Sequence, residues 1–151
     1  MKIRIRIISI VLAVLLSVSP LAAEAAGFTN EFQAKISKML LELALTAGGV
    51  EYDIKQSYTD FIVYITDEEM SEILTINMLF GTDESDKELE NLVQINVDWL
   101  SSIYTDIVEM GMDNLNVLFL WVYSFDEPDY VFLAVCNNEM IYDWSASHRN
   151  E

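Results

Sequence analysis

A dense run of apolar residues lies in the C-terminal third of the chain, where the pattern predicts three consecutive β-strands. Residues 117–125 are almost wholly apolar, rich in β-branched and aromatic side chains, and too few for a typical helix, which indicates a strand. The turn at 126–129 ends this strand, because its proline fixes its own backbone and restricts the residue before it. Residues 130–136 and 140–144 predict two further strands, joined by an asparagine pair (137–138) that suits a two-residue hairpin turn.

The first of these strands has apolar residues on both of its faces. Alternation places Val117, Phe119 and Trp121 on one face and Leu118 and Leu120 on the other. An antiparallel strand with one face in water would instead alternate apolar with polar residues. We therefore expect both faces to be covered, either by helices of the same chain or by a second copy or another partner. An uncovered apolar face would be an interaction site or an aggregation hazard.

Three stretches upstream of these strands show the three- and four-residue apolar spacing of amphipathic helices. The first covers residues 29–47 and ends at the glycine pair 48–49. The second starts at Thr66, which has Glu69 three residues later, as in a capping box. The third and longest covers residues 86–110, after a short polar loop.

Two shorter strands are predicted between the first and second helices. Residues 50–56 alternate apolar and charged side chains, which indicates a half-exposed strand at a sheet edge. Residues 61–66 form a second strand after a turn at 57–60, unless the two runs are one long strand bent by a bulge. Antiparallel hairpins beside helices predict an α+β fold, with an antiparallel sheet of four to five strands packed with two to three helices. The chain of 151 residues is long enough for one such domain, at residues 26–144.

The N-terminal segment predicts an export signal outside this domain. Basic residues at positions 2, 4 and 6 precede a short apolar run, and small residues follow at Ala23 and Ala25. This is the pattern of a secretory signal peptide, with cleavage after Ala25. We therefore expect residues 1–25 to be removed, a secreted, periplasmic or extracellular location, and no membrane association after cleavage; an uncleaved N-terminal anchor is the alternative. Residues 145–151 are interpreted as a polar C-terminal tail.

The chain is strongly acidic, with 25 acidic and 8 basic residues. Removal of residues 1–25 would take away three basic residues and one acidic residue and leave a formal charge of −19. Such a charge repels nucleic acid, a polyanion that proteins meet with Lys and Arg clusters, and it repels anionic lipid headgroups. The charge therefore argues against nucleic-acid partners. Solubility explains it, and the alternatives are cationic partners or loosely held Ca²⁺.

The acidic residues closest to a calcium-binding pattern are Asp83, Asp86 and Glu88. They gather carboxylate oxygens, which Ca²⁺ prefers as ligands. An EF-hand loop counted from Asp83 would need glycine at its sixth position and glutamate at its twelfth, but these positions hold Glu88 and Gln94. The three residues are therefore candidates for loose Ca²⁺ binding alone, and no cofactor is predicted.

The sequence predicts no catalytic residue. Its one histidine, His148, lies in the tail, and it has one cysteine, so the domain lacks the residues for a zinc site or a histidine-based triad. Paired carboxylates leave one alternative function, a small exported hydrolase that uses Asp126 with Asp129 or Asp67 with Glu69. Turn formation and helix capping explain the same four residues.

Aromatic residues near strand ends are the candidates for binding. Tyr and Trp combine an apolar ring with a polar group and suit binding surfaces. Tyr123, Tyr130 and Trp144 are selected because each lies close to the end of a predicted strand; core packing is the alternative. The sequence thus predicts a non-enzymatic exported domain that binds a protein, peptide or small ligand through its sheet face, or that self-associates as a homodimer.

The order of the predicted elements resembles that of small uncharacterised secreted α+β proteins of bacteria. It is also similar to that of the cystatin-like and nuclear-transport-factor-2-like folds. The resemblance covers element order and transfers no functional residue. It implies one further alternative, a cone-shaped domain whose half-open sheet wraps round the long helix and encloses a ligand pocket.

Overall fold

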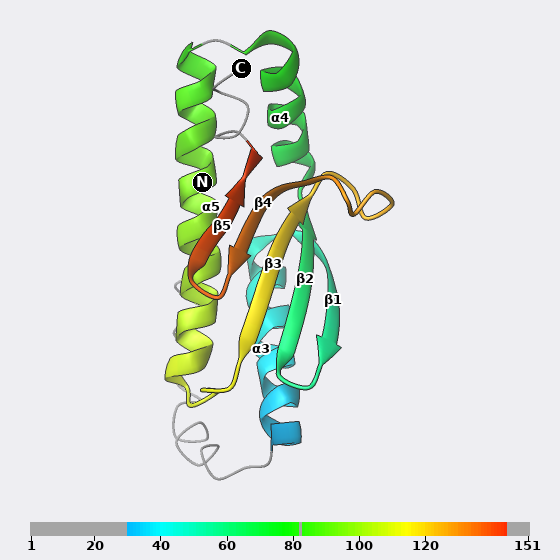
Figure 1. Cartoon of the computed structure of the whole chain (residues 1–151), viewed down its shortest axis with the longest axis vertical. Coiled ribbons are helices and arrows are strands. Elements are labelled where there is room, and N and C mark those ends of the chain that lie inside the picture. Colours follow the sequence, from blue (N-terminus) through cyan, green and yellow to red (C-terminus); the bar gives the residue numbers. More distant parts are fainter. Residues whose placement is uncertain (1–29, 82, 145–151) are drawn as a thin grey trace.

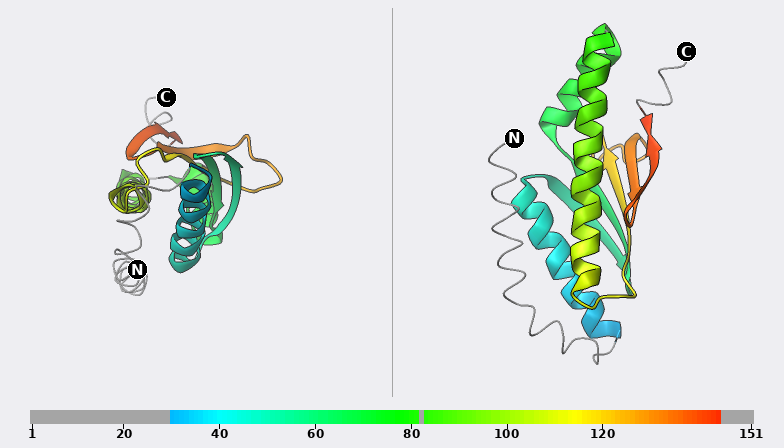
Figure 2. Two further views of the ribbon diagram at one scale, coloured as in Figure 1. Left: turned by 90° about the horizontal axis from the view of Figure 1, so that it is seen from below. Right: turned by 90° about the vertical axis from the view of Figure 1, so that its left-hand side faces the viewer.

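Three helices and five strands make up the part of the chain that the computed structural model describes, residues 30–81 and 83–144. In chain order they are α3 (Asn30–Gly48), β1 (Glu51–Ser57), β2 (Asp60–Thr66), α4 (Glu68–Phe80), α5 (Asp83–Glu109), β3 (Asn116–Val122), β4 (Val131–Cys136) and β5 (Glu139–Asp143). The strands form one sheet, with α3 and α5 on the same side of it, and α4 extends past the end of the sheet (Figures 1 and 2). The predicted α+β class is confirmed.

The predicted signal peptide and the C-terminal tail lie outside the described residues. In the described ranges, no helix has both the length and the apolar composition that a membrane crossing requires.

The sheet is mixed, so the prediction of a purely antiparallel sheet is wrong. The strand order is β1-β2-β3-β4-β5, and the pairs β1–β2, β3–β4 and β4–β5 are antiparallel. The central pair β2–β3 is parallel, in a register that runs from Asp60 opposite Asn116 to Ile65 opposite Trp121. Parallel neighbours need a long crossover connection, and α4 and α5 together provide it.

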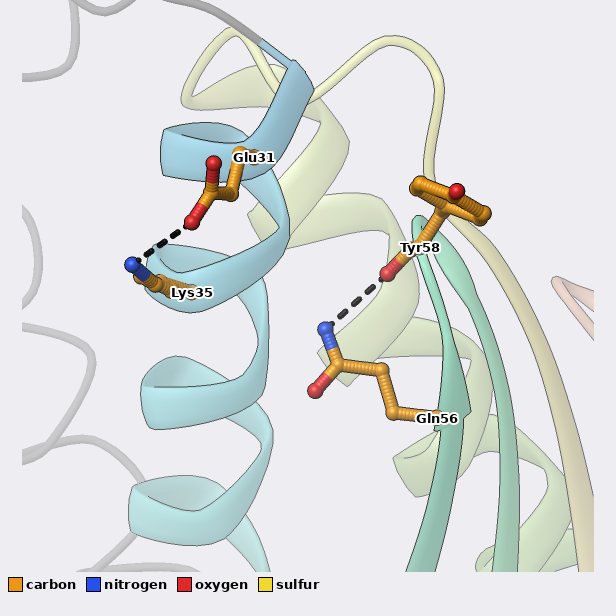
Figure 3. Close-up of polar contacts among 4 residues, drawn as sticks. All are labelled: Glu31, Lys35, Gln56 and Tyr58. Carbon is orange, nitrogen blue, oxygen red and sulfur yellow. Dashed lines mark hydrogen bonds and ion pairs between the residues drawn. The ribbon is translucent and has the colours of Figure 1, made fainter.

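A two-residue turn joins β1 to β2. Ser57 pairs with Asp60, and Tyr58 between them has a φ of 54°. The side-chain amide of Gln56 donates a hydrogen bond of 2.9 Å to the Tyr58 carbonyl oxygen, which stabilises the turn (Figure 3). The alternative of one long strand bent by a bulge is therefore wrong.

The asparagine turn between β4 and β5 is confirmed. Asn137 has a φ of 58°, a backbone conformation that asparagine tolerates better than most residues. Its side-chain oxygen also accepts a hydrogen bond of 2.8 Å from the Val117 N–H, so the turn is joined to the start of β3.

One face of the sheet and the helices enclose the hydrophobic core. Leu41 and Leu45 on α3 are fully buried, and Leu100 on α5 is 1% exposed. The sheet supplies the fully buried side chains of Val63, Val117 and Phe119 to the same core. On the outer side of α3, Lys35 and Glu31 form an exposed ion pair of 2.9 Å, one helical turn apart (Figure 3).

The two glycines that end α3 have different roles. Gly49 has a φ of 72°, the conformation that commonly terminates a helix. Gly48 is buried, and a Cβ atom placed on it would collide with the ring of Trp99 on α5. The sequence predicts a helix stop for the pair, and the structure adds a close helix contact at Gly48.

The starts of α4 and α5 differ from their predicted positions. Asp67, rather than Thr66, is the N-cap of α4, and its side chain accepts a hydrogen bond of 3.1 Å from the Met70 N–H. The Thr66 hydroxyl instead donates to the carbonyl oxygen of Tyr123, at 3.2 Å. α5 begins at Asp83, because most of the predicted polar loop is already helical.

The described helices leave one face of the sheet uncovered, so the expectation that this chain covers both faces is wrong for the described residues. Figure 2 shows α3 and α5 on a single side of the sheet. Cross-strand pairing places half-buried or exposed apolar residues together on the other side, which we call the outer sheet face: Ile62, Tyr64, Leu118, Leu120, Cys136 and Tyr142. Whether a second copy covers this face stays a prediction.

Candidate functional site

A pocket of about 340 Å³ is lined by residues of α4, of the loop between β3 and β4, and of the start of β4, together with Trp144. Its volume falls within the usual range of small-ligand sites. We call it the α4 pocket, and most of its lining is apolar or aromatic: Leu74, Thr75, Tyr123, Glu127, Tyr130, Val131, Phe132 and Trp144.

Aromatic rings packed edge to face or tilted against one another support one wall of the α4 pocket. Phe132 is buried, and the centroid of its ring lies 6.3 Å from that of Trp121. Trp121 in turn meets Trp99 edge to face, with ring centroids 6.3 Å apart. Both distances fall in the favourable range for aromatic pairs, so the position of Phe132 is fixed by the core behind it.

Hydrogen bonds join Tyr123, the residue that follows β3, to the end of β2 and to the first turn of α4. The carbonyl oxygen of Tyr123 accepts from the Thr66 hydroxyl, and also from the Ser71 hydroxyl on the first turn of α4, at 3.4 Å. Met70 and Leu74 bury the inner side of the helix in the core. The helix wall of the pocket is therefore held by the Ser71 side-chain hydrogen bond and by the buried apolar side of α4.

The loop between β3 and β4 forms the remaining wall. The Tyr123 N–H donates to the Tyr130 carbonyl oxygen across the base of the loop, at 3.2 Å. Within the loop, Glu127 donates its N–H to the Ser124 carbonyl and accepts from the Tyr130 N–H at its own carbonyl, each at 3.2 Å. Two consecutive turns thus hold Glu127 at the pocket, while the side chains of Tyr123 and Tyr130 are 50% and 68% exposed.

The structure brings the three aromatic residues selected from the sequence into this one pocket. Tyr123 and Tyr130 come from the two ends of the loop, and Trp144 directly follows β5. Their role in binding stays a prediction. The sequence reasoning missed Leu74 and Thr75, because nothing in the apolar spacing of α4 indicates that the helix faces residues some fifty positions later. It also missed Glu127, which it assigned only to a turn.

The carboxylate pairs considered for hydrolysis do not line the α4 pocket. Asp126 and Asp129 are exposed in the loop, and neither lines the α4 pocket. The carboxylate of Asp67 caps α4. Asp106 on α5 has a raised pKa, first because burial desolvates its carboxyl group and second because Glu109 lies nearby, but it too lies outside the pocket lining.

Two of the residues considered for calcium binding, Asp86 and Glu88, are not part of the α4 pocket lining either. Asp86 accepts a hydrogen bond of 3.2 Å from the side-chain amide of Asn77, and Glu88 is exposed on α5. The side chain of Asp83 lies outside the described part of the structure. Within the described residues, no group of three or more His, Cys, Asp or Glu side chains could hold a metal ion.

Comparisons of the chain with protein-family models, with curated proteins and with solved structures found no match.

Proposed function

We propose that the chain is an exported, non-enzymatic binding domain whose α4 pocket holds an apolar or aromatic group of a ligand. The observation that carries the proposal is a pocket lined by aromatic side chains from separate elements, with its walls fixed by hydrogen bonds and by the core. Binding sites for small molecules are typically preformed, concave and largely apolar with a few polar groups. The export part of the proposal rests on the signal-peptide pattern of residues 1–25.

Replacing Thr75 with tryptophan is expected to fill the pocket and weaken binding of a neutral apolar dye, N-phenyl-1-naphthylamine, at least about tenfold, which corresponds to about 1.4 kcal/mol. Thr75 lines the pocket from α4 and is half-buried, so a large ring at this position competes with the dye for the same space. The measurement is the rise in dye fluorescence during titration.

Ile76→Trp is the matched control, because Ile76 is the next residue on α4, is 54% exposed and does not line the pocket. It should bind the dye as the unmodified protein does. Equal dye binding by Thr75→Trp and the unmodified protein would contradict a role for the pocket, and so would the absence of dye binding.

Self-association through the outer sheet face is a second candidate function, favoured by the uncovered apolar residues there. Leu120 lies in the middle of this face, between Tyr64 on β2 and Ala134 on β4. If two copies pack these faces together, Leu120→Lys should halve the mass measured by light scattering, because it places two charges in the interface.

Ile76→Lys is the control for the added charge, since it places a lysine at an exposed position on α4 and not on the sheet. It should leave the mass unchanged. A monomeric mass for the unmodified protein would reject self-association at the concentration tested.

A further inference from the structure

The α4 pocket is largely apolar, and the charged residues near it in the structure are acidic. Glu127 is part of its lining, and Asp126 and Asp129 are exposed in the same loop. The two segments that build the pocket, α4 and residues 122–144, contain no Lys or Arg. A ligand with a positive charge next to its apolar group therefore complements the pocket better than a neutral or anionic ligand does.

Exposed tyrosine rings offer such a charge a second contact. Tyr123 and Tyr130 line the pocket and remain half or more exposed. The face of a tyrosine ring attracts Lys and Arg side chains. The protein already contains one such pair, in which the Lys55 ammonium nitrogen lies 4.7 Å from the centroid of the Tyr64 ring.

The strand next to the pocket indicates that the ligand is a polypeptide. β5 is an edge strand of the sheet, and its residues from Glu139 to Tyr142 are exposed. It leads directly into Trp144, which lines the pocket. An edge strand with accessible backbone groups can pair with an extended peptide, whose side chains then occupy neighbouring pockets.

The chain's own C-terminal tail is a poor occupant of the pocket. Residues 145–151 follow Trp144 and have the sequence SASHRNE. They include one arginine but no large apolar side chain that could fill an aromatic pocket. Because residues 1–25 are expected to be removed, we expect the fitting segment to come from another chain.

We infer that the α4 pocket takes an extended segment of another polypeptide, which pairs with the β5 edge, inserts an apolar side chain and places an adjacent Lys or Arg at Glu127. The inference rests on the proposed function and adds to it the chemical class of the partner.

Three synthetic peptides of one length test this inference by calorimetric titration of the protein. Each has blocked ends and a central phenylalanine, flanked by lysine in the first peptide, glutamine in the second and glutamate in the third. The lysine peptide should bind about three- to tenfold more tightly than the glutamine peptide, as expected for one or two exposed ion pairs, and the glutamate peptide should bind least. Higher salt should reduce this preference.

Glu127→Gln should remove most of the preference for lysine over glutamine. Glu51→Gln is the matched control, because it removes the same charge from β1, at the opposite edge of the sheet, and should keep the preference. A lysine peptide that is N-methylated at alternate residues should bind more weakly, because it has fewer N–H groups to donate to β5.

Equal binding of all three peptides, with dye binding still sensitive to Thr75→Trp, would overturn the inference and leave the proposed function standing. Unchanged affinity of the N-methylated peptide would overturn strand pairing at β5. Absence of both peptide and dye binding would overturn the inference together with the proposed function.

Discussion

Replacing Leu41 with alanine is expected to lower the free energy of unfolding by about 2–5 kcal/mol. Leu41 lies on α3, is completely buried and belongs to the core cluster between the helices and the sheet. The loss combines the transfer energy of the removed methyl and methylene groups with the cost of the cavity that remains, since a close-packed core relaxes only partly. The measurement is the urea midpoint, together with the slope of the transition.

Leu43→Ala is the matched control for this prediction. Leu43 stands two positions later on the same helix but is 41% exposed, so the same chemical change should cost less than about 1 kcal/mol. Similar losses for the two variants would mean that α3 does not bury the face described here. An unchanged slope for both variants would show that the loss arises from stability and not from a changed unfolded state.

Replacing Gly48 with alanine is expected to destabilise the protein by about 1–3 kcal/mol, because the added methyl group collides with the ring of Trp99. The ring cannot move away freely, since it also packs against Trp121 in the core. The better helix propensity of alanine offsets part of the collision, by up to about 1 kcal/mol. The midpoint of denaturant unfolding measures the net change.

A double-mutant cycle separates this collision from effects on the backbone. In a Trp99→Leu background, which removes the ring, Gly48→Ala should cost much less than it does alone. Gly49→Ala should cost about 1–2 kcal/mol in either background, because its strain comes from a positive φ and nothing lies within 4 Å of the added atom. A cost of Gly48→Ala that is independent of Trp99 would contradict the contact between α3 and α5.

The local elements of the fold could be predicted because short-range chemistry determines them. The apolar run before residue 123 and the positive φ of Asn137 follow from side-chain type and position alone. The direction of β3 relative to β2 does not follow from these local features, because it depends on how α4 and α5, which connect the two strands, pack. Both a parallel and an antiparallel β2–β3 pair are compatible with the same apolar alternation.

Only part of the pocket could be predicted from the sequence, for a similar reason. Tyr123, Tyr130 and Trp144 could be selected because amphipathic rings near strand ends are often available for contact. Thr75 gives no such signal, since a threonine inside a helix is ordinary. Its place in the lining follows from the position of α4, whose first turn is joined by the Ser71 hydroxyl to the carbonyl oxygen of Tyr123, directly after β3.

The parallel pairing of β2 with β3 also divides the sheet into two local folding units. The connections within the β1–β2 hairpin and between β3, β4 and β5 are two to eight residues long, so these strands can pair locally. The junction between these units joins Asp60 to Asn116, 56 positions apart, so its formation requires closure of a long segment. We therefore expect pairing across that junction to be the slowest step in completing the sheet.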